Sequence, residues 1–371
     1  MIPHSRPFLD DEDTRAVLEV LRSGQLVQGA AVAAFEEAFC REMDLHGTVE
    51  TGSEEFASRS HGVAVSSGTA ALHLTLLALG LKRGDEVIIP SYVCTALWHA
   101  VRYTGATPVL ADIEGDTFNL SALDVLPRLT KNTKAVILPH MFGQAADLDD
   151  LVKLGIPIIE DCAQSLGSYY RGQPTGTFGT AAIFSFYATK VIAAGEGGMV
   201  VSRDGNLIDR IRDMRDYDEK DTLSLRFNYK LTDMQAALGM SQLKKLPAFI
   251  ARRQDIARRY DRVLREAGLT PPVKKPDRDH SYFRYVFLLD SVDRFFEDIG
   301  RQGVVCRRPV FRPLHDYRGL TGFEVTKRVW RRAVSVPIYP GLTDEEIESM
   351  VSLLPIALDR HLHNDKYNRD R

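Results

Sequence analysis

The hydrophobic positions between residues 60 and 202 form short apolar runs that alternate with stretches of helical periodicity. Gly or Pro bounds most of these runs, and this layout predicts a largely parallel sheet covered by helices, an α/β fold. Most runs are apolar throughout, as expected of strands that are covered on both faces. The predicted strands are Val63–Val65, Glu86–Ile89, Pro108–Leu110, Ala135–Leu138, Ile156–Ile159, Ala182–Phe186 and Met199–Val201.

The pattern changes in the last third of the chain. Residues 232–266 have helical periodicity, and Pro247 is expected to divide them into two helices. The proline-rich stretch 271–277 predicts a linker, and the segments beyond it predict a small α+β lobe. We therefore expect a large domain over residues 1–245 and a smaller C-terminal lobe with a polar tail over residues 246–371. The elements predicted for the lobe are a strand at 285–289 and helices near 291–301 and 343–354.

The composition is that of a folded, enzyme-sized protein. The chain has 371 residues, 44% of them hydrophobic, with a net charge of -3, so we expect neither disorder nor binding to nucleic acid or an anionic membrane. No apolar stretch approaches the roughly 20 residues that span a bilayer, and the N-terminus lacks a signal-peptide pattern. Widely spaced cysteines without metal-ligand spacing predict no metal site and a reducing, cytoplasmic location. The cysteines are Cys40, Cys94, Cys162 and Cys306.

Three segments carry candidate chemistry, and the first is the turn S-S-G-T-A-A-L at residues 66–72. It lies where a predicted strand ends and a helix begins, with Gly68 and Thr69 at the start of the helix. A helix N-terminus offers unpaired N–H groups and a positive dipole end, and small residues let a phosphate approach closely. Such a turn is also an ordinary helix cap, so on its own it leaves both interpretations open.

The second and third segments each follow a predicted buried strand. Asp161, in E-D-C-A-Q, stands at the carboxyl end of its strand, where open α/β sheets bind ligands. An acid there either caps a helix or partners a buried cation such as a protonated ring nitrogen. Lys190 precedes a glycine-rich turn. Desolvation there would lower the pKa of its amine and free it as a nucleophile. The alternative is a solvated surface lysine, which is the usual case for a lone lysine. Together, a phosphate-compatible helix start, a strand-end acid and a strand-end lysine are what pyridoxal phosphate requires.

Several longer motifs contain these segments and carry a family resemblance. In order and spacing they resemble the DegT/DnrJ/EryC1/StrS family of sugar aminotransferases, which depend on pyridoxal phosphate, over nearly the whole chain. The resemblance implies the type I aminotransferase fold, a mostly parallel seven-stranded sheet flanked by helices with a smaller α+β C-terminal lobe. It also implies a homodimer whose active sites lie at the subunit interface. The motifs are S-S-G-T-A-A-L-H-L, G-D-E-V-I-I-P-S-Y, E-D-C-A-Q-S-L-G, G-T-F-G-T-A-A-I-F-S-F-Y-A-T-K, G-E-G-G-M-V and F-N-Y-K-L-T-D-M-Q-A-A-L-G.

The resemblance assigns roles at the cofactor. Lys190 matches the Schiff-base lysine, and Asp161 matches the partner of the pyridinium nitrogen. Gln164 falls where the family places a side chain against the cofactor ring or its hydroxyl. Asn228 matches an asparagine that reaches the phosphate from the neighbouring subunit. The positions that match the phosphate cup are Gly68, Thr69 and Ser185.

One segment departs from the family pattern. At P-S-Y-V-C, Cys94 occupies the position where the family usually has an aromatic side chain stacked on the cofactor ring. Tyr92 lies two residues away and shares a face with Cys94 if the segment is extended. We therefore expect both side chains to contact the cofactor, with Tyr92 supplying the aromatic surface that the smaller thiol lacks.

Three residues are candidates for substrate binding. His315, in P-L-H, resembles a histidine near the sugar site of the family, and a packing role is the alternative. Arg312 ends the cationic run R-R-P-V-F-R, which is either a solvated face or a contact for a nucleotide diphosphate or substrate carboxylate. Lys230 is the candidate from the motif F-N-Y-K.

The resemblance implies transfer of an amino group, with L-glutamate the expected donor, to a nucleotide-linked keto-deoxysugar in amino-sugar biosynthesis. The cofactor would alternate between pyridoxal and pyridoxamine phosphate, with Lys190 moving the proton. A cyclitol acceptor and a PLP-binding regulator without turnover stay open as alternatives. A dehydratase of the same family is disfavoured, because such members replace the lysine by histidine. The sequence selects neither the sugar and nucleotide nor the aminated carbon, C-3 or C-4.

Overall fold

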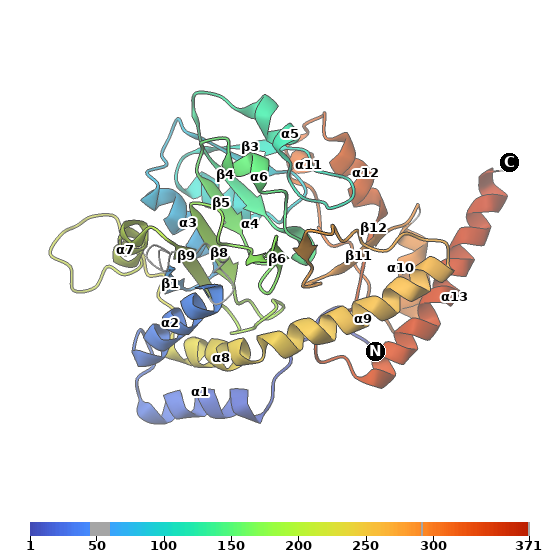
Figure 1. Ribbon diagram of the computed structural model, residues 1–371, viewed down its shortest axis with the longest axis horizontal. Coiled ribbons are helices and arrows are strands. Elements are labelled where there is room, and N and C mark those ends of the chain that lie inside the picture. Colours follow the sequence, from blue (N-terminus) through green and yellow to red (C-terminus); the bar gives the residue numbers. More distant parts are fainter. Residues whose placement is uncertain (45–59, 291, 370–371) are drawn as a thin grey trace.

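The computed structural model describes residues 1–44, 60–290 and 292–369. A helix-covered sheet forms the larger part of the molecule, and a smaller lobe built from the C-terminal third lies beside it (Figure 1). The sheet has the order β1-β9-β8-β5-β4-β2-β3, and β9 runs antiparallel to both of its neighbours. All seven predicted strands are present, which confirms the mostly parallel α/β fold. Their bounds are β1 His61–Val65, β2 Glu86–Pro90, β3 Thr107–Ala111, β4 Thr133–Pro139, β5 Ile158–Asp161, β8 Ala181–Ser185 and β9 Gly198–Ser202.

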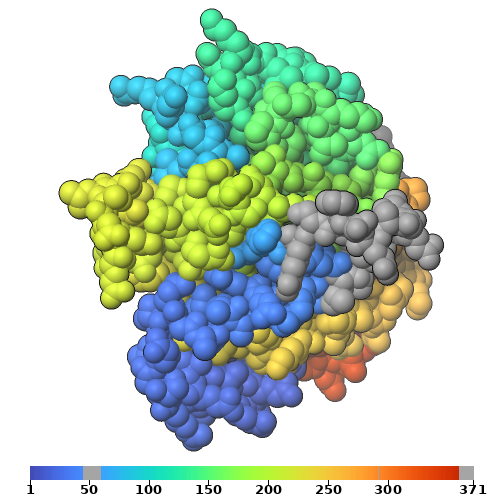
Figure 2. Space-filling view, turned by 60° about the vertical axis from the view of Figure 1, so that its left-hand side comes forward, coloured from blue at the N-terminus to red at the C-terminus, as the bar shows by residue number. Residues whose placement is uncertain are grey.

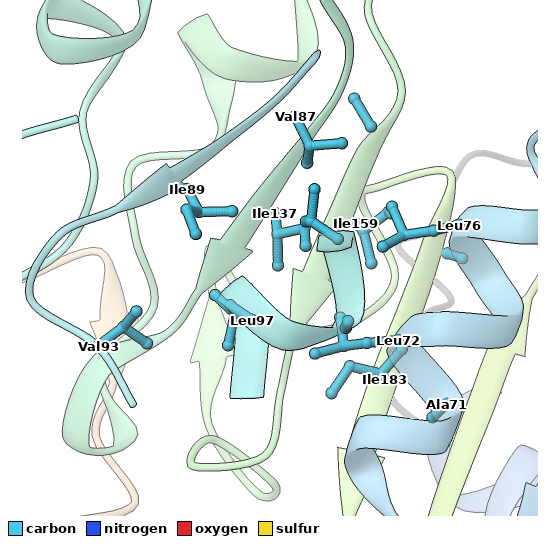
Figure 3. Close-up of a cluster of buried hydrophobic side chains, with 14 of the residues drawn as sticks. Ala71, Leu72, Leu76, Val87, Ile89, Val93, Leu97, Ile137, Ile159 and Ile183 are labelled. Carbon is cyan, nitrogen blue, oxygen red and sulfur yellow. The ribbon is translucent and has the colours of Figure 1, made fainter. Parts of the chain in front are cut away.

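The sheet is buried on both faces because its strands are apolar at successive positions. Ile89, Ile137 and Ile159 point to one face and pack with Leu72 of helix α3 (Gly68–Ala78) (Figure 3). The residues that precede them in each strand point to the opposite face and form a second cluster, as the two-residue period of a strand requires. This second cluster includes Ile88, Val136 and Ile158.

Two helices predicted from the periodicity of residues 232–266 are present as α8 (Asp233–Lys244) and α9 (Leu246–Glu266). The break falls at Lys245, and Pro247 lies in the first turn of α9, where its missing N–H costs no helical hydrogen bond. None of the described helices is long and apolar enough to cross a membrane. The other helices of the larger part are α1 Asp11–Ser23, α2 Ala30–Asp44, α4 Ala96–Tyr103, α5 Ala122–Val125, α6 Asp149–Val152, α7 Gly205–Met214 and the 3-10 turns η1 Leu126–Arg128 and η2 Met141–Gly143.

The smaller lobe has its own apolar core around a two-stranded antiparallel sheet, β11 (Tyr285–Leu288) and β12 (Ala333–Val336). The predicted strand and the helix near 291–301 are present, whereas the last helix, α13 (Asp344–Arg369), continues well beyond its predicted end. Helix α9 joins the two parts, since Phe249 packs beneath the main sheet and Ile256 packs in the lobe (Figure 1). The remaining elements are β6 Tyr169–Tyr170, β7 Gln173–Pro174, β10 Arg278–Asp279, α10 Val292–Arg301, α11 Leu314–Arg318 and α12 Glu324–Arg332.

Candidate active site

The candidate site forms at the carboxyl edge of the main sheet, where parallel strands release their side chains together. Asp161 is the last residue of β5 and lies in register with Ile183 of the neighbouring strand β8. Lys190 follows β8 by a short turn, and its charge and that of Asp161 act on each other. The fold thus brings together the acid and the lysine that the sequence singled out.

Asp161 is a buried carboxylate, with 7% of its surface exposed. Burial raises its pKa, while a hydrogen bond from the N–H of Ala163 and the charges of Lys190 and His140 act in the opposite direction. The Ala163 nitrogen lies 3.0 Å from Oδ1. A buried carboxylate with only one such hydrogen bond is suited to pair with a cationic ring nitrogen, which would favour its ionised form.

Glu160, the neighbour of Asp161, has a structural role. Its carboxylate accepts hydrogen bonds from the N–H groups of Gly176, Phe178 and Gly179 and from Nε2 of His140. Burial alone would raise its pKa, but these hydrogen bonds hold the pKa below its usual range. Glu160 and His140 also lie close to Cys162. Because the carboxylate oxygens are occupied by internal donors, Glu160 ties the strand to the following loops.

Lys190 lies against the ring of Phe283, with its Nζ atom 5.2 Å from the ring centroid. Burial lowers its pKa and Arg284 lowers it further, whereas Cys94 and Asp161 raise it. The net direction is downward. A lysine with a lowered pKa holds more of its amine in the neutral form, which is the form that attacks a carbonyl or takes a proton.

The start of α3 forms a cradle for an anion. Ser67 caps the helix through a hydrogen bond from the N–H of Ala70, so the N–H groups of Gly68 and Thr69 belong to the first turn, which has no intrahelical acceptors. A Cβ atom on Gly68 would lie 3.0 Å from Cβ of Ser185. The start of α3 therefore packs so closely against the end of β8 that a side chain larger than that of glycine would push the two elements apart. This arrangement fits a phosphate group, and Asp161 and Lys190 fit the rest of pyridoxal phosphate.

Gln164 is held in place by its side-chain carbonyl. Oε1 accepts a hydrogen bond from the N–H of Phe142 at 3.1 Å. Phe142 belongs to the turn η2 and has a positive φ of 59°, a conformation that turns its N–H towards the loop after β5. The side-chain NH2 group of Gln164 can then donate a hydrogen bond to a ligand, for example to the oxygen of a ring hydroxyl.

The structure separates Cys94 from Tyr92. The chain bends after β2, so the extended segment on which the expectation depended is absent. Tyr92 is fully buried and packs near Phe118 and Phe142, whereas Cys94 is exposed. Surrounding protein and the charge of Asp161 nevertheless raise the pKa of the Cys94 thiol. The geometry therefore favours Cys94, and not Tyr92, as the side chain that faces the site.

Asn228 and Lys230 lie in the segment between α7 and α8. Asn228 is exposed, and its neighbours Phe227 and Tyr229 stack on each other with ring centroids 5.0 Å apart. Alternate side chains of an extended segment point in opposite directions, so Asn228 points away from this aromatic pair. The Nζ atom of Lys230 lies 2.6 Å from a carboxylate oxygen of Asp216. Its charge is therefore paired within the chain.

His315 and Arg312 lie around the short helix α11. His315 is fully buried, with Nδ1 2.7 Å from Oγ of Ser91, and its ring stacks on Phe323. These contacts favour the packing role that the sequence left as the alternative. Arg312 is exposed, donates to the carbonyl of Asp316 and lies over a tyrosine ring.

Sequence reasoning missed Phe283, whose ring lies against Lys190, and Arg284, whose charge helps to lower the pKa of Lys190. The available signal is an aromatic residue followed by an arginine at the entry to an apolar strand, F-R-Y-V-F-L. Nothing in the sequence places this pair beside a lysine more than ninety residues away. Their role follows only from the packing of the lobe against the sheet.

Comparison with known proteins identifies the family. A model of the DegT/DnrJ/EryC1/StrS aminotransferase family matches residues 7–354. The GDP-perosamine synthase of Vibrio cholerae is 33% identical, over 95% of this chain and 98% of the relative. That of Caulobacter vibrioides is 31% identical, over 95% of this chain and 97% of the relative.

Solved structures agree with this assignment. The structure of DesV from S. venezuelae is 32% identical and superposes with a TM-score of 0.85, covering 95% of this chain and 98% of that one. The PLP form of the sugar aminotransferase Spr1654 from Streptococcus pneumoniae is 26% identical, with a TM-score of 0.85, covering 97% of this chain and 99% of that one. The fold is therefore that of PLP-dependent aminotransferases, and the cofactor is pyridoxal phosphate. The chain belongs to the DegT/DnrJ/EryC1/StrS aminotransferase family.

Proposed function

We propose that this aminotransferase moves an amino group from L-glutamate to a keto-deoxysugar that is linked to a nucleotide, in the biosynthesis of an amino sugar. The observation that carries the proposal is that Lys190, whose pKa is lowered, and the buried Asp161 lie near enough at the carboxyl edge of the sheet for their charges to act on each other. The GDP-perosamine synthases among its relatives support a nucleotide-linked acceptor.

The residues of the site divide the chemistry among them. Bound pyridoxal phosphate supplies an electron sink for the electrons of the Cα–H bond. Asp161 holds a proton on the ring nitrogen, because a carboxylate favours the cationic form of its partner. The N–H groups at the start of α3 and Ser185 hold the phosphate. The Nζ atom of Lys190 takes the proton from the donor Cα, and its lowered pKa keeps it available as a base.

A second copy of this chain is the proposed partner, with shared active sites. The segment between α7 and α8 projects from the surface in yellow, and it carries the exposed side chains of Leu223, Leu225 and Asn228 (Figure 2). Exposed leucines on a projecting segment suit a protein interface. Asn228 would then complete the phosphate site of the other subunit. Light scattering tests this proposal, and a fully active monomer would contradict it.

We also propose a cytoplasmic location and the division into two domains at residues 245 and 246. None of the four cysteines, all of which lie within the described residues, forms a disulfide, which suits a reducing compartment. The two apolar clusters reached by α9 support a large and a small folding unit. Fractionation of cells and limited proteolysis test these two proposals.

The function is tested with the purified enzyme and ¹⁵N-labelled L-glutamate. A panel of nucleotide-linked keto sugars and keto-inositols is incubated with the labelled donor, and products are mapped by NMR. Label in an aminated nucleotide sugar is the expected result, and its position identifies the carbon. Label in a cyclitol would overturn the acceptor class. If glutamate loses no amino group with any acceptor, the protein binds the cofactor without turnover.

A further inference from the structure

Arg284 is a half-buried arginine directly ahead of β11, and its charge acts on Lys190. The Cζ atom of Arg284 lies 4.8 Å from the centroid of the Phe283 ring, and Nζ of Lys190 lies 5.2 Å from the same centroid. The positive charge of Arg284 also contributes to the lowered pKa of Lys190. Two cations thus rest against one aromatic ring at the edge of the active site.

Backbone hydrogen bonds fix Arg284 relative to the cofactor position. Its N–H donates to the carbonyl of Phe142 at 3.2 Å. The N–H of Phe142 in turn donates to Oε1 of Gln164 at 3.1 Å. Phe142 therefore links Arg284 to Gln164, the residue that the family pattern sets against the cofactor ring.

The charge of Arg284 forms no ion pair with a carboxylate in the part of the chain that the structure describes. One guanidinium nitrogen lies 3.3 Å from Nδ1 of His4, and Nε2 of His4 lies 2.9 Å from Oγ of Ser335. Burial, together with Arg284 and Arg307, lowers the pKa of His4 to about 3. His4 is therefore neutral and leaves the positive charge unbalanced.

Three arginines of the described chain are more deeply buried than Arg284, and each has carboxylate or carbonyl acceptors. Arg215 lies 2.7 Å from a carboxylate oxygen of Glu36, and Arg278 lies 2.8 Å from one of Asp277. Arg253 donates to three backbone carbonyls. Burial and Arg307 lower the pKa of Arg284 to about 10, which still leaves it charged at neutral pH. A half-buried charge without a carboxylate partner is incompletely compensated, so an anion that enters the site would bind there with a favourable interaction.

We propose that Arg284 binds the α-carboxylate of the amino-acid donor, beside the Cα atom from which Lys190 removes the proton. This inference rests on the proposed function. In every α-amino acid the carboxylate is bonded to that Cα, so it enters the site next to Lys190. A guanidinium binds a carboxylate through two parallel hydrogen bonds. The diphosphate of a nucleotide sugar is several bonds from the keto carbon, so the donor is the better match for this position.

The test compares Arg284→Gln with wild type and with Arg284→Lys, which keeps the charge but loses the planar fork. Arg301→Gln is the matched control, since Arg301 is an exposed arginine of α10. In the half-reaction with L-glutamate, Arg284→Gln should raise the KM by about ten- to a hundred-fold, the range for a lost charge-assisted contact. The KM of Arg284→Lys should lie between those of Arg284→Gln and wild type, and the KM of the control variant should equal that of wild type.

Two further measurements separate binding from folding. Calorimetry with 2-oxoglutarate, which does not react with the pyridoxal form, should show weaker binding to Arg284→Gln by a similar factor. Without cofactor or substrate, Arg284→Gln should unfold at the same temperature as wild type or a higher one, because the change removes an uncompensated charge. A purely structural role through His4 predicts the opposite, a lower unfolding temperature.

The outcomes distinguish this proposal from the proposed function. An unchanged KM for glutamate together with unchanged 2-oxoglutarate binding would overturn the role of Arg284. A raised KM for the nucleotide sugar alone would assign the anion site to the diphosphate and overturn the donor assignment. If wild type does not react with glutamate, the proposed function fails, and the calorimetric titration still decides whether Arg284 binds the carboxylate.

Discussion

The carboxylate of Asp161 is held in surroundings that raise its pKa, mainly because it is buried. A cationic partner would stabilise its ionised form, and a protonated ring nitrogen is such a partner. The same pairing stabilises the protonated ring, so the two groups favour each other's charged state. Replacement of the carboxylate by an amide removes this mutual effect with little change of volume.

Asp161→Asn should therefore retain cofactor but slow the half-reaction with glutamate by about 100-fold or more, the scale on which one electrostatic partner acts. Stopped-flow absorbance of the bound cofactor measures this rate. Asp150→Asn, at an exposed position, is the control. A rate for Asp161→Asn close to that of wild type would show that the carboxylate does not partner the ring nitrogen.

At this scale the sequence singles out residues near the ends of strands, whereas it does not show which residues a bend of the chain brings to the site. Asp161 and Lys190 were singled out because each lies at or shortly after the end of an apolar run that becomes a strand, and their roles stay predictions. The expectation for Tyr92 assumed an extended chain after β2, but the chain bends there and buries the ring. Arg284 could not be placed, because the groups around it come from the turn after β8 and from the turn η2.

Among the elements, helix α3 depends on the absence of a side chain at Gly68. A methyl group there would meet Cβ of Ser185 at 3.0 Å, so β8 and α3 would have to separate slightly. This contact lies where the phosphate is expected to bind.

Gly68→Ala should weaken cofactor binding by about 1–3 kcal/mol, the usual cost of overpacking a close contact. Dialysis followed by the visible absorbance of the bound cofactor measures the loss. Gly300→Ala is the control, because Gly300 has open space around it and an ordinary φ. Equal retention in Gly68→Ala and wild type would place the phosphate elsewhere.

The elements themselves were largely predictable. Runs such as Ile156–Ile159 read as strands because continuous apolar character over four or five residues is typical of strands covered on both faces. The two-residue strands β6, β7 and β10 escaped prediction, since a pair of residues carries no periodicity. The end of α13 was also missed because no glycine or proline follows residue 355 to mark it.

At the scale of the whole molecule, the N-terminal segment and α9 fasten the lobe to the sheet. Ile2 pairs with Val304 of the lobe, and Asp10 forms an ion pair with Lys245 at the junction of α8 and α9. His280, at the entry to the lobe, is buried and stacks on Tyr282 with ring centroids 4.0 Å apart. Its Nδ1 accepts a hydrogen bond from the N–H of Tyr282.

His280 makes the stability of the protein depend on pH. Burial, with a contribution from Lys274, lowers its pKa from 6.5 to about 3, so the folded protein holds it neutral. The unfolded chain binds a proton that the folded state does not, so the free energy of unfolding falls as the pH drops from about 6.5 towards 3.

His280→Gln should reduce the loss of unfolding free energy between neutral pH and pH 5 by about 2 kcal/mol, because only the unfolded histidine gains a proton over that interval. Urea unfolding near neutral pH and near pH 5 measures it. His61→Gln, at an exposed histidine, is the control. The same slope in His280→Gln and wild type would mean that another group titrates.

The central claim is that Lys190 forms the covalent bond with pyridoxal phosphate at the carboxyl edge of the sheet. Borohydride reduction of the holoenzyme fixes such a bond, and mass spectrometry of a protease digest then locates the modified peptide. We predict a single cofactor adduct on the peptide that contains Lys190, and its loss in Lys190→Ala. An adduct on a different lysine in the wild-type enzyme would contradict the account of the site.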